Sequence, residues 1–320
     1  MSAIDSISVG VDALKRNLVP LYVVGAIIAV GGGLVVGLQH FPRLGLLLAL
    51  GVGAIWLFAE PFVAGGYLAM LDEAIDGETD YDTLAEEGKE NYLDLLIGRI
   101  LVLGAEYALW ALVGVAIFVM LIVFFGAAIG AAAAEEATAV LAASTLFLVA
   151  IPVLVVFAWL LTIIVGFFIQ FYAVAIVLED ENFAQGFVRS AGVVKNNPLS
   201  VLGYSLIVWV IQLLVAIPVG IGWMLQDFGR DVVYALLTDD ATGTGEEPFG
   251  GEPTGGTPTG DGAAGTGGDG ALEALLLAEG FGFGIFLVIL VVLFLLRTLT
   301  IPILRAYHVA FYRSITDRAG

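Results

Sequence analysis

Polar residues within the long apolar segments of this 320-residue chain include Glu60, Glu106, Gln170 and Arg297. An ionisable group inside a membrane-spanning helix is costly to desolvate, so it marks either a partner or a functional site. Glu60 and Glu106 each lie about ten residues, or about 15 Å, from the predicted inner end of a span. Gln170 and Arg297 fall in the same half of the membrane. We therefore expect the four residues to form one intramembrane polar cluster.

Within this cluster we expect Arg297 to pair with Glu60 or Glu106, because a carboxylate–guanidinium contact relieves two desolvation costs at once. Two roles are consistent with such a pair. It can be a structural clasp that fixes the order of the helices, or a site for proton-coupled or ion-coupled translocation. We favour the clasp, because a single pair does not make a pathway.

Other kinds of site chemistry have little support in the sequence. The chain has no cysteine, which excludes a disulfide framework, a thiolate nucleophile and a cysteine-ligated metal. Its two histidines, His40 and His308, lie near opposite ends, and no Ser/His/Asp constellation or basic patch is visible. We therefore predict no catalytic residues, no cofactor, no metal and no nucleic-acid partner, and we do not expect an enzyme.

Composition places the four polar residues in a membrane protein. Hydrophobic residues make up 60% of the chain and the mean hydropathy is +1.00, yet 31 acidic residues against 12 basic ones give a net charge of −19. Both properties hold together only if the charges lie in loops between apolar spans. A span needs about 20 apolar residues. Six segments qualify: 19–39, 44–70, 97–126, 144–178, 199–225 and 280–304.

The predicted fold is all-α, an integral membrane bundle of six transmembrane helices arranged as three hairpins, with interfacial amphipathic helices. Apolar residues recur every three or four positions within 1–18, which predicts an interfacial helix before the first span. Residues 226–279 form an acidic outer loop, disordered around 238–270, where almost no large apolar residue occurs. The remaining segments are the membrane domain 19–225 with spans one to five, its amphipathic cytoplasmic connections at 71–96 and 179–198, span six at 280–304 and a cytoplasmic tail at 305–320.

Basic residues set the orientation of the spans. With the N-terminus inside, nine of the twelve basic residues lie on the cytoplasmic side, two on the outer side and one within a span. We therefore predict a multi-pass protein of the cell membrane with both termini in the cytoplasm. The lipid bilayer is the expected partner, and the cytoplasmic amphipathic helices are candidate surfaces for protein partners.

Two cytoplasmic connections share the pattern K-x-N-x-L-x-x-L where each opens a new span. The first contains Lys89 and Asn91, and the second contains Lys195 and Asn197. Residues 305–312 also resemble the Tyr-containing span endings that precede these connections. We favour an internal duplication over chance matching. In each copy the lysine would reach lipid phosphate and the asparagine would satisfy backbone groups at the helix entry.

The second connection also carries a family resemblance. Residues 175–180, Arg189-Ser190 and Lys195-Asn196-Asn197 resemble an uncharacterised multi-pass membrane family of halophilic archaea. They are more distantly similar to the membrane domain attached to some glycerophosphodiester phosphodiesterases. The resemblance implies a helical membrane protein of unknown activity. The catalytic domain of those enzymes is absent, so their activity is not implied.

The acid excess agrees with a salt-rich habitat. Only three of the twelve basic residues are lysine, and residues 72–94 alone hold ten acids. Self-repulsion of this kind is largely removed at molar salt, where the screening length falls to roughly 3 Å. We therefore predict an acidic protein of a halophile, most simply a structural or interaction component of the cell envelope. The alternative is a transporter or exporter that uses the cluster of Glu60, Glu106 and Arg297.

Overall fold

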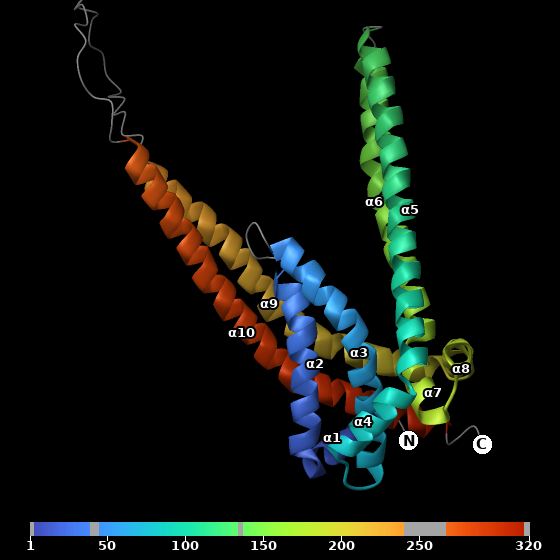
Figure 1. Cartoon of the computed structure of the whole chain (residues 1–320). Helices are drawn as coiled ribbons and strands as arrows, with labels where there is room; N and C mark the ends of the chain where they lie inside the picture. Colours follow the sequence, from blue (N-terminus) through green and yellow to red (C-terminus); the bar gives the residue numbers. More distant parts are fainter. Residues whose placement is uncertain (1–2, 39–44, 134–136, 240–266, 317–320) are drawn as a thin grey trace, which may run out of the picture. The chain divides into compact units, whose positions relative to one another are not determined.

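The computed structural model describes residues 3–38, 45–133, 137–239 and 267–316 (Figure 1). The predicted all-α class is confirmed, because the regular structure of these residues is helical and they contain no strand. Six of their helical segments are long and apolar enough to cross a membrane, as the sequence predicts: Leu18–Leu38, Gly45–Asp76, Tyr92–Gly130, Phe147–Glu179, Pro198–Leu225 and Gly284–Thr316. Most of the segment predicted to be disordered, residues 240–266, lies outside the described residues.

The described residues form ten helices, and the chain falls into two compact units. The first unit comprises Met1–Trp209 and Thr298–Gly320, and the second comprises Val210–Arg297. The helices are α1 (Ala3–Arg16), α2 (Leu18–Leu38), α3 (Gly45–Asp76), α4 (Tyr81–Glu90), α5 (Tyr92–Ala133), α6 (Ala137–Ile169), α7 (Tyr172–Glu179), α8 (Phe183–Asn196), α9 (Pro198–Asp239) and α10 (Gly267–Thr316).

The second unit is a helical pair formed by the later part of α9 and the earlier part of α10. The rings of Trp223 and Phe286 lie 6.0 Å apart between the two helices. A Cβ added to Gly222 would lie 2.8 Å from Cγ1 of Ile289. The small residue thus allows the two helices to pack closely, as is common between helices in membranes.

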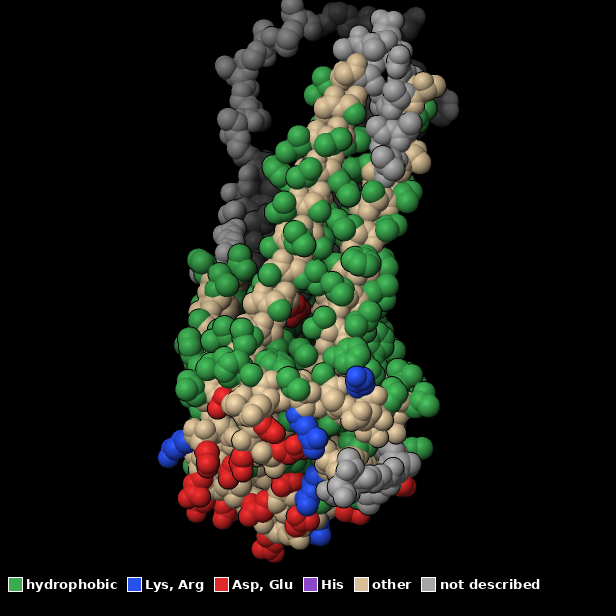
Figure 2. Space-filling model, turned by 90° about the vertical axis from the view of Figure 1, so that its right-hand side faces the viewer, with side chains coloured by type: hydrophobic (Ala, Val, Ile, Leu, Met, Phe, Trp, Pro, Cys, Tyr) green, Lys and Arg blue, Asp and Glu red, His purple; other side chains and the backbone are tan. Residues whose placement is uncertain are grey.

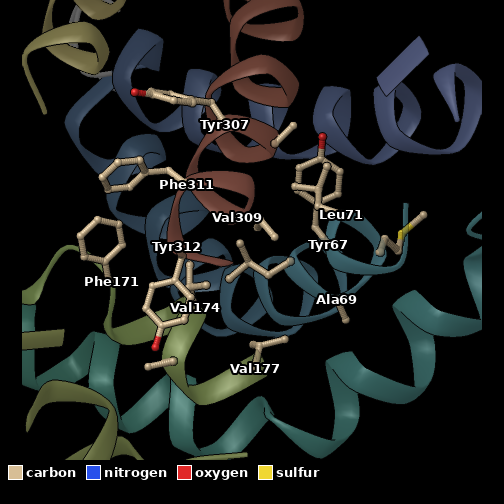
Figure 3. Packing of buried hydrophobic residues seen from close by; sticks show 14 of the residues in the cluster. Tyr67, Ala69, Leu71, Phe171, Val174, Val177, Tyr307, Val309, Phe311 and Tyr312 are labelled. Carbon is tan, nitrogen blue, oxygen red and sulfur yellow. The ribbon is translucent and has the colours of Figure 1, made fainter. Parts of the chain in front are cut away.

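The first unit contains the main hydrophobic core, which we call the cap core. It lies where α1, α4, α7 and α8 meet the ends of α3 and α10, and large aromatic side chains fill it (Figure 3). Its largest fully buried side chains include Tyr67, Phe171, Tyr307, Phe311 and Tyr312. Burial of each aromatic side chain contributes on the order of 2–3 kcal/mol, so this core orders the short helices that could not be stable alone.

The last of these aromatic residues lie in the segment predicted to be a cytoplasmic tail from residue 305. Helix α10 continues through this segment to Thr316, and the placement of the segment in the cytoplasm stays a prediction. The helix continues because Tyr307, Phe311 and Tyr312 repeat at helical spacing and are almost fully buried in the cap core. The end of span six is therefore part of the core that positions the other cap helices.

Each amphipathic helix of the cap has a glycine against the backbone of a span end. In α1, a Cβ added to Gly10 would lie 2.9 Å from the carbonyl carbon of Ala306 in α10, so no side chain fits between the two backbones. Helix α1 therefore packs against the last span. Helix α4 approaches α3 in the same way, because a Cβ added to Gly88 would lie 2.8 Å from the carbonyl oxygen of Phe62. Helix α8 approaches α7, where a Cβ added to Gly186 would lie 3.1 Å from the carbonyl oxygen of Tyr172.

An asparagine stands at each junction between an amphipathic helix and the next span. Asn17 joins α1 to α2, Asn91 joins α4 to α5, and Asn197 joins α8 to α9. At all three junctions the side-chain amide donates a hydrogen bond to the carbonyl four residues earlier, at 3.3, 3.2 and 3.3 Å. The backbone carbonyl of each asparagine in turn accepts a hydrogen bond from the backbone N–H four residues later. The side chain thus helps to satisfy a carbonyl at the end of each amphipathic helix.

The junction at Asn17 is a third copy that the sequence comparison missed. It has the same spacing, Lys15-x-Asn17, but Val19 replaces the leucine that follows in the other two copies. The three lysines of the chain therefore all stand two residues before a junction asparagine. Origin of the copies by duplication stays a prediction.

Replacing Asn17 by alanine should destabilise the cap more than the same change at Asn197. The Asn17 amide donates to the Gly77 carbonyl at 2.9 Å, and its Oδ1 accepts from the Thr79 N–H at 3.0 Å. Asn17→Ala leaves these backbone groups unpaired at a buried site, which costs about 2–4 kcal/mol. Asn197→Ala is the control, because Asn197 is half-buried and bonds to the Val193 carbonyl alone among the described residues; it should cost about 1 kcal/mol or less. Unfolding of both variants in detergent measures the difference, and equal losses would contradict this role for Asn17.

Candidate functional site

Glu60 forms an ion pair inside the first unit, with a partner that the sequence analysis did not include. Its Oε2 lies 3.1 Å from Nε of Arg99, and the two side chains are 20% and 38% exposed. Glu60 lies in α3 directly before Pro61, and Arg99 lies in the second turn of α5, so the pair joins spans two and three. The count of basic residues placed Arg99 on the cytoplasmic side, although it falls within the predicted span 97–126. Helix α5 begins at Tyr92, so Arg99 lies inside its apolar run.

Gln170 lies at a break in span four, between α6 and α7. Its Nε2 donates to the Phe167 carbonyl at 3.0 Å, and its Oε1 accepts from the hydroxyl of Ser205 in α9 at 3.1 Å. Gln170 therefore holds two helices together and also satisfies a carbonyl that the break exposes. Neither contact involves Glu60 or Glu106.

A buried serine satisfies the rest of this break. The Ser190 hydroxyl, from α8, donates to the Phe168 carbonyl at 2.8 Å and accepts from the Phe171 N–H at 3.0 Å. Ser190 is fully buried. A backbone break in an apolar environment is tolerated only when its polar groups find other partners, and one side chain supplies two of them here.

His308 also contributes to the contacts around the break. Its Nδ1 is hydrogen-bonded to the hydroxyl of Tyr204 in α9, and its ring stacks on Phe171 with centroids 5.0 Å apart. The histidine is buried among the aromatic residues of the cap core. The sequence analysis named His308 and Ser190 but not these contacts, and it did not name Ser205, because a single histidine or serine carries no spacing signal for its partner.

The other two members of the predicted cluster lie in different surroundings. Glu106 is exposed on α5, and no described residue forms a hydrogen bond or ion pair with it. Arg297 ends the second unit, and its Nη1 is buried without a hydrogen-bond partner among the described residues. The pairing of Arg297 with Glu60 or Glu106 stays a prediction, whereas the described partner of Glu60 is Arg99.

Acidic residues from two connections surround a hollow of about 410 Å³ in the first unit. On the face that Figure 2 shows, Asp and Glu side chains gather at one end, next to a broad hydrophobic region. The carboxylates that line the hollow come from α3, α4 and the turn after α7: Asp72, Glu73, Glu86, Glu87 and Asp180. None of the described His, Asp and Glu residues forms a group of three placed to hold a metal ion.

Two of these carboxylates have identifiable surroundings. The Glu73 carboxylate accepts hydrogen bonds from the hydroxyls of Thr79 and Thr83, at 2.8 and 2.7 Å. Partial burial raises the pKa of Glu87, and the nearby charges of Glu90 and Asp180 raise it further. The ionised form of Glu87 is therefore disfavoured in the folded protein.

Taken together, the described polar groups of the first unit serve contacts between helices. Glu60 and Arg99 join α3 to α5, Gln170 joins the break to α9, and His308 joins α10 to α9. The lysines of the predicted motif, Lys89 and Lys195, are exposed at the helix ends. This arrangement can position helices and present a surface.

Comparison with known proteins finds one family. Residues 1–315 match the family described as domain of unknown function DUF7847. The chain belongs to this family. The matched residues include nearly the whole of the six apolar spans and residues of both compact units. No curated protein and no solved structure matches the chain.

Breaking the Glu60–Arg99 pair should destabilise the first unit. Glu60→Gln and Arg99→Gln each leave one charge in an apolar span without its partner, at a cost of about 1–3 kcal/mol, given that Arg99 is partly exposed. The double exchange Glu60→Arg with Arg99→Glu should recover most of the loss. Unfolding in detergent measures all three. Glu106→Gln is the control and should change stability by less than about 0.5 kcal/mol, because Glu106 has no described partner. Single variants as stable as this control would rule out the pair as a clasp.

The charge of Glu87 should make stability depend on pH. Its pKa is raised in the folded protein, so the ionised carboxylate is less favourable in the folded state than in the unfolded chain. Stability is therefore lost as pH rises through the ordinary range for glutamate, and Glu87→Gln should raise the melting temperature at pH 7 but not below about pH 4. Glu86→Gln, on the same helix, is the matched control and should give a smaller gain.

In molar KCl at pH 7, the melting temperature of Glu87→Gln should exceed that of the unchanged chain by less, because screening weakens the repulsion from Glu90 and Asp180. The contribution of burial should remain. A gain from Glu87→Gln that is the same at pH 4 and pH 7 would contradict this account.

Proposed function

We propose that this DUF7847 chain is a structural or interaction component of a cell envelope, in which six spans anchor a helical cap that contacts other molecules. The observation that carries the proposal is that polar side chains of the first unit form contacts between helices. In the first unit, Glu60, Gln170 and His308 each contact a neighbouring helix. Polar side chains used in this way fix helix order, whereas a transport path needs such groups along an open route.

The setting that supports this role is the cell membrane, with both termini in the cytoplasm. The distribution of basic residues favours this orientation, which would place α1, α4, α7 and α8 on the cytoplasmic side. A salt-rich source is supported by the net charge of −19 and by the five carboxylates around one hollow. The likeness to the membrane domain of glycerophosphodiester phosphodiesterases would then concern the membrane architecture alone.

Transport is the second candidate, and two observations favour it. Glu106 is an exposed carboxylate within a span, and Nη1 of Arg297 is buried without a hydrogen-bond partner among the described residues. Unpaired ionisable groups in spans often mark ion or proton routes. A transporter would bind its substrate or ion at Glu106 or Arg297, whereas a structural protein would not.

Two measurements on the full chain separate the two candidates. A photoreactive residue at Tyr81, exposed on α4 of the cap, should give discrete protein crosslinks in native membranes. The same residue at Tyr107, exposed on α5, is the matched control and should react with lipid. In proteoliposomes with an imposed pH or ion gradient, the chain should add no flux. Crosslinks absent at Tyr81, or a flux that Glu106→Gln abolishes, would overturn the structural role.

A further inference from the structure

Helix α8 differs in charge from the other short helices of the cap, α1, α4 and α7, each of which contains at least one acid. Its fourteen residues, Phe183–Asn196, contain Arg189 and Lys195 but no aspartate or glutamate. By contrast, the ten residues of α4 contain four acids and one lysine. A cap helix without acids, beside three that carry them, points to surroundings that do not favour negative charge.

The buried and exposed residues of α8 form two distinct faces. The buried face packs onto the cap through residues that recur at helical spacing: Gly186, Ser190, Val193 and Val194. The opposite face exposes Val188, at 75%, and Lys195. Leu199, just beyond the junction, is 82% exposed. A Cβ added to Gly192 would have no neighbour within 4 Å, so nothing described covers this face.

The position of α8 indicates what covers its exposed face. It directly follows the end of span four and directly precedes span five, so it lies at the level where spans leave the membrane. The exposed apolar surface continues from Leu199 to Leu202 and Leu206 on α9. This face is therefore continuous with the surface that faces lipid, and apolar side chains beside a lysine are typical of helices at a lipid interface.

The charges around the three junction lysines distinguish Lys195 from the other two. Lys15 lies 3.3 Å from the carboxylate of Asp12, and Lys89 is followed by Glu90 on the acidic helix α4. Lys195 forms no ion pair with a described residue and has no acid on its own helix. The other cation of α8, Arg189, is already neutralised by two hydrogen bonds to Glu179, at 2.6 and 3.1 Å.

We propose that the exposed face of α8 lies on the membrane surface and binds the headgroup of an anionic phospholipid. The Lys195 ammonium contacts the lipid phosphate, while Val188 and Leu199 lie against the acyl chains. The site supplies an exposed lysine on a helix without acids, and it is independent of whether the protein is structural or a transporter.

Native mass spectrometry of the full chain in non-ionic detergent tests this site. Phosphatidylglycerol should be retained more strongly than phosphatidylcholine. Lys195→Gln should weaken phosphatidylglycerol retention about fivefold, which corresponds to about 1 kcal/mol for one basic residue at a lipid surface. Lys195→Arg should preserve retention. Lys89→Gln is the matched control, at the same place in an acidic junction, and should leave retention unchanged.

Further variants and a competitor keep the proposal testable. Val188→Asp places a negative charge on the exposed face without touching the cap core. It should lower phosphatidylglycerol retention, and it serves as the test if Lys195→Gln proves poorly folded. Excess inorganic phosphate should not displace the lipid, because the acyl contacts are part of the site. Equal retention of the two lipids, an equal loss from Lys89→Gln, or displacement by phosphate alone would each overturn the proposal.

Discussion

The close contact between each amphipathic helix and the backbone of a span end is the constraint on which the first unit depends. At Gly10, Gly88 and Gly186 the two backbones approach so closely that a side chain has no room. Such contacts hold short helices that carry too few hydrogen bonds to be stable alone. They also place the aromatic residues of α3, α7 and α10 in one core, because those residues lie on the same span ends (Figure 3).

Desolvation explains how the polar residues of the spans are used. A break in span four exposes backbone groups that water cannot reach, and Ser190 and Gln170 supply partners for them. Glu60 would be costly alone, and Arg99 from the next span neutralises it. Each partner comes from a different part of the chain, so these interactions also specify which helices are neighbours.

The repeated motif predicted two of the three junctions between an amphipathic helix and a span, and it missed the third. The motif K-x-N predicted the junctions at Asn91 and Asn197, where an amphipathic helix meets a span. It missed the junction at Asn17, because Val19 occupies the place of the expected leucine and the apolar residue type there is only weakly specified by lipid. The asparagine is the better signal, since its amide makes the same hydrogen bond to the carbonyl four residues earlier in all three copies.

The sequence by itself determined the helical class, the six apolar spans and the places where charged connections interrupt them. It could do so because the length and hydropathy of a span are local properties that the thickness of a membrane dictates. Only the tertiary structure decided that Glu60 pairs with Arg99, that Ser190 bridges a break in another helix, and that Asp72 and Asp180 line one hollow. These contacts join residues far apart in the chain, and their choice depends on how side chains pack between helices rather than on any local pattern.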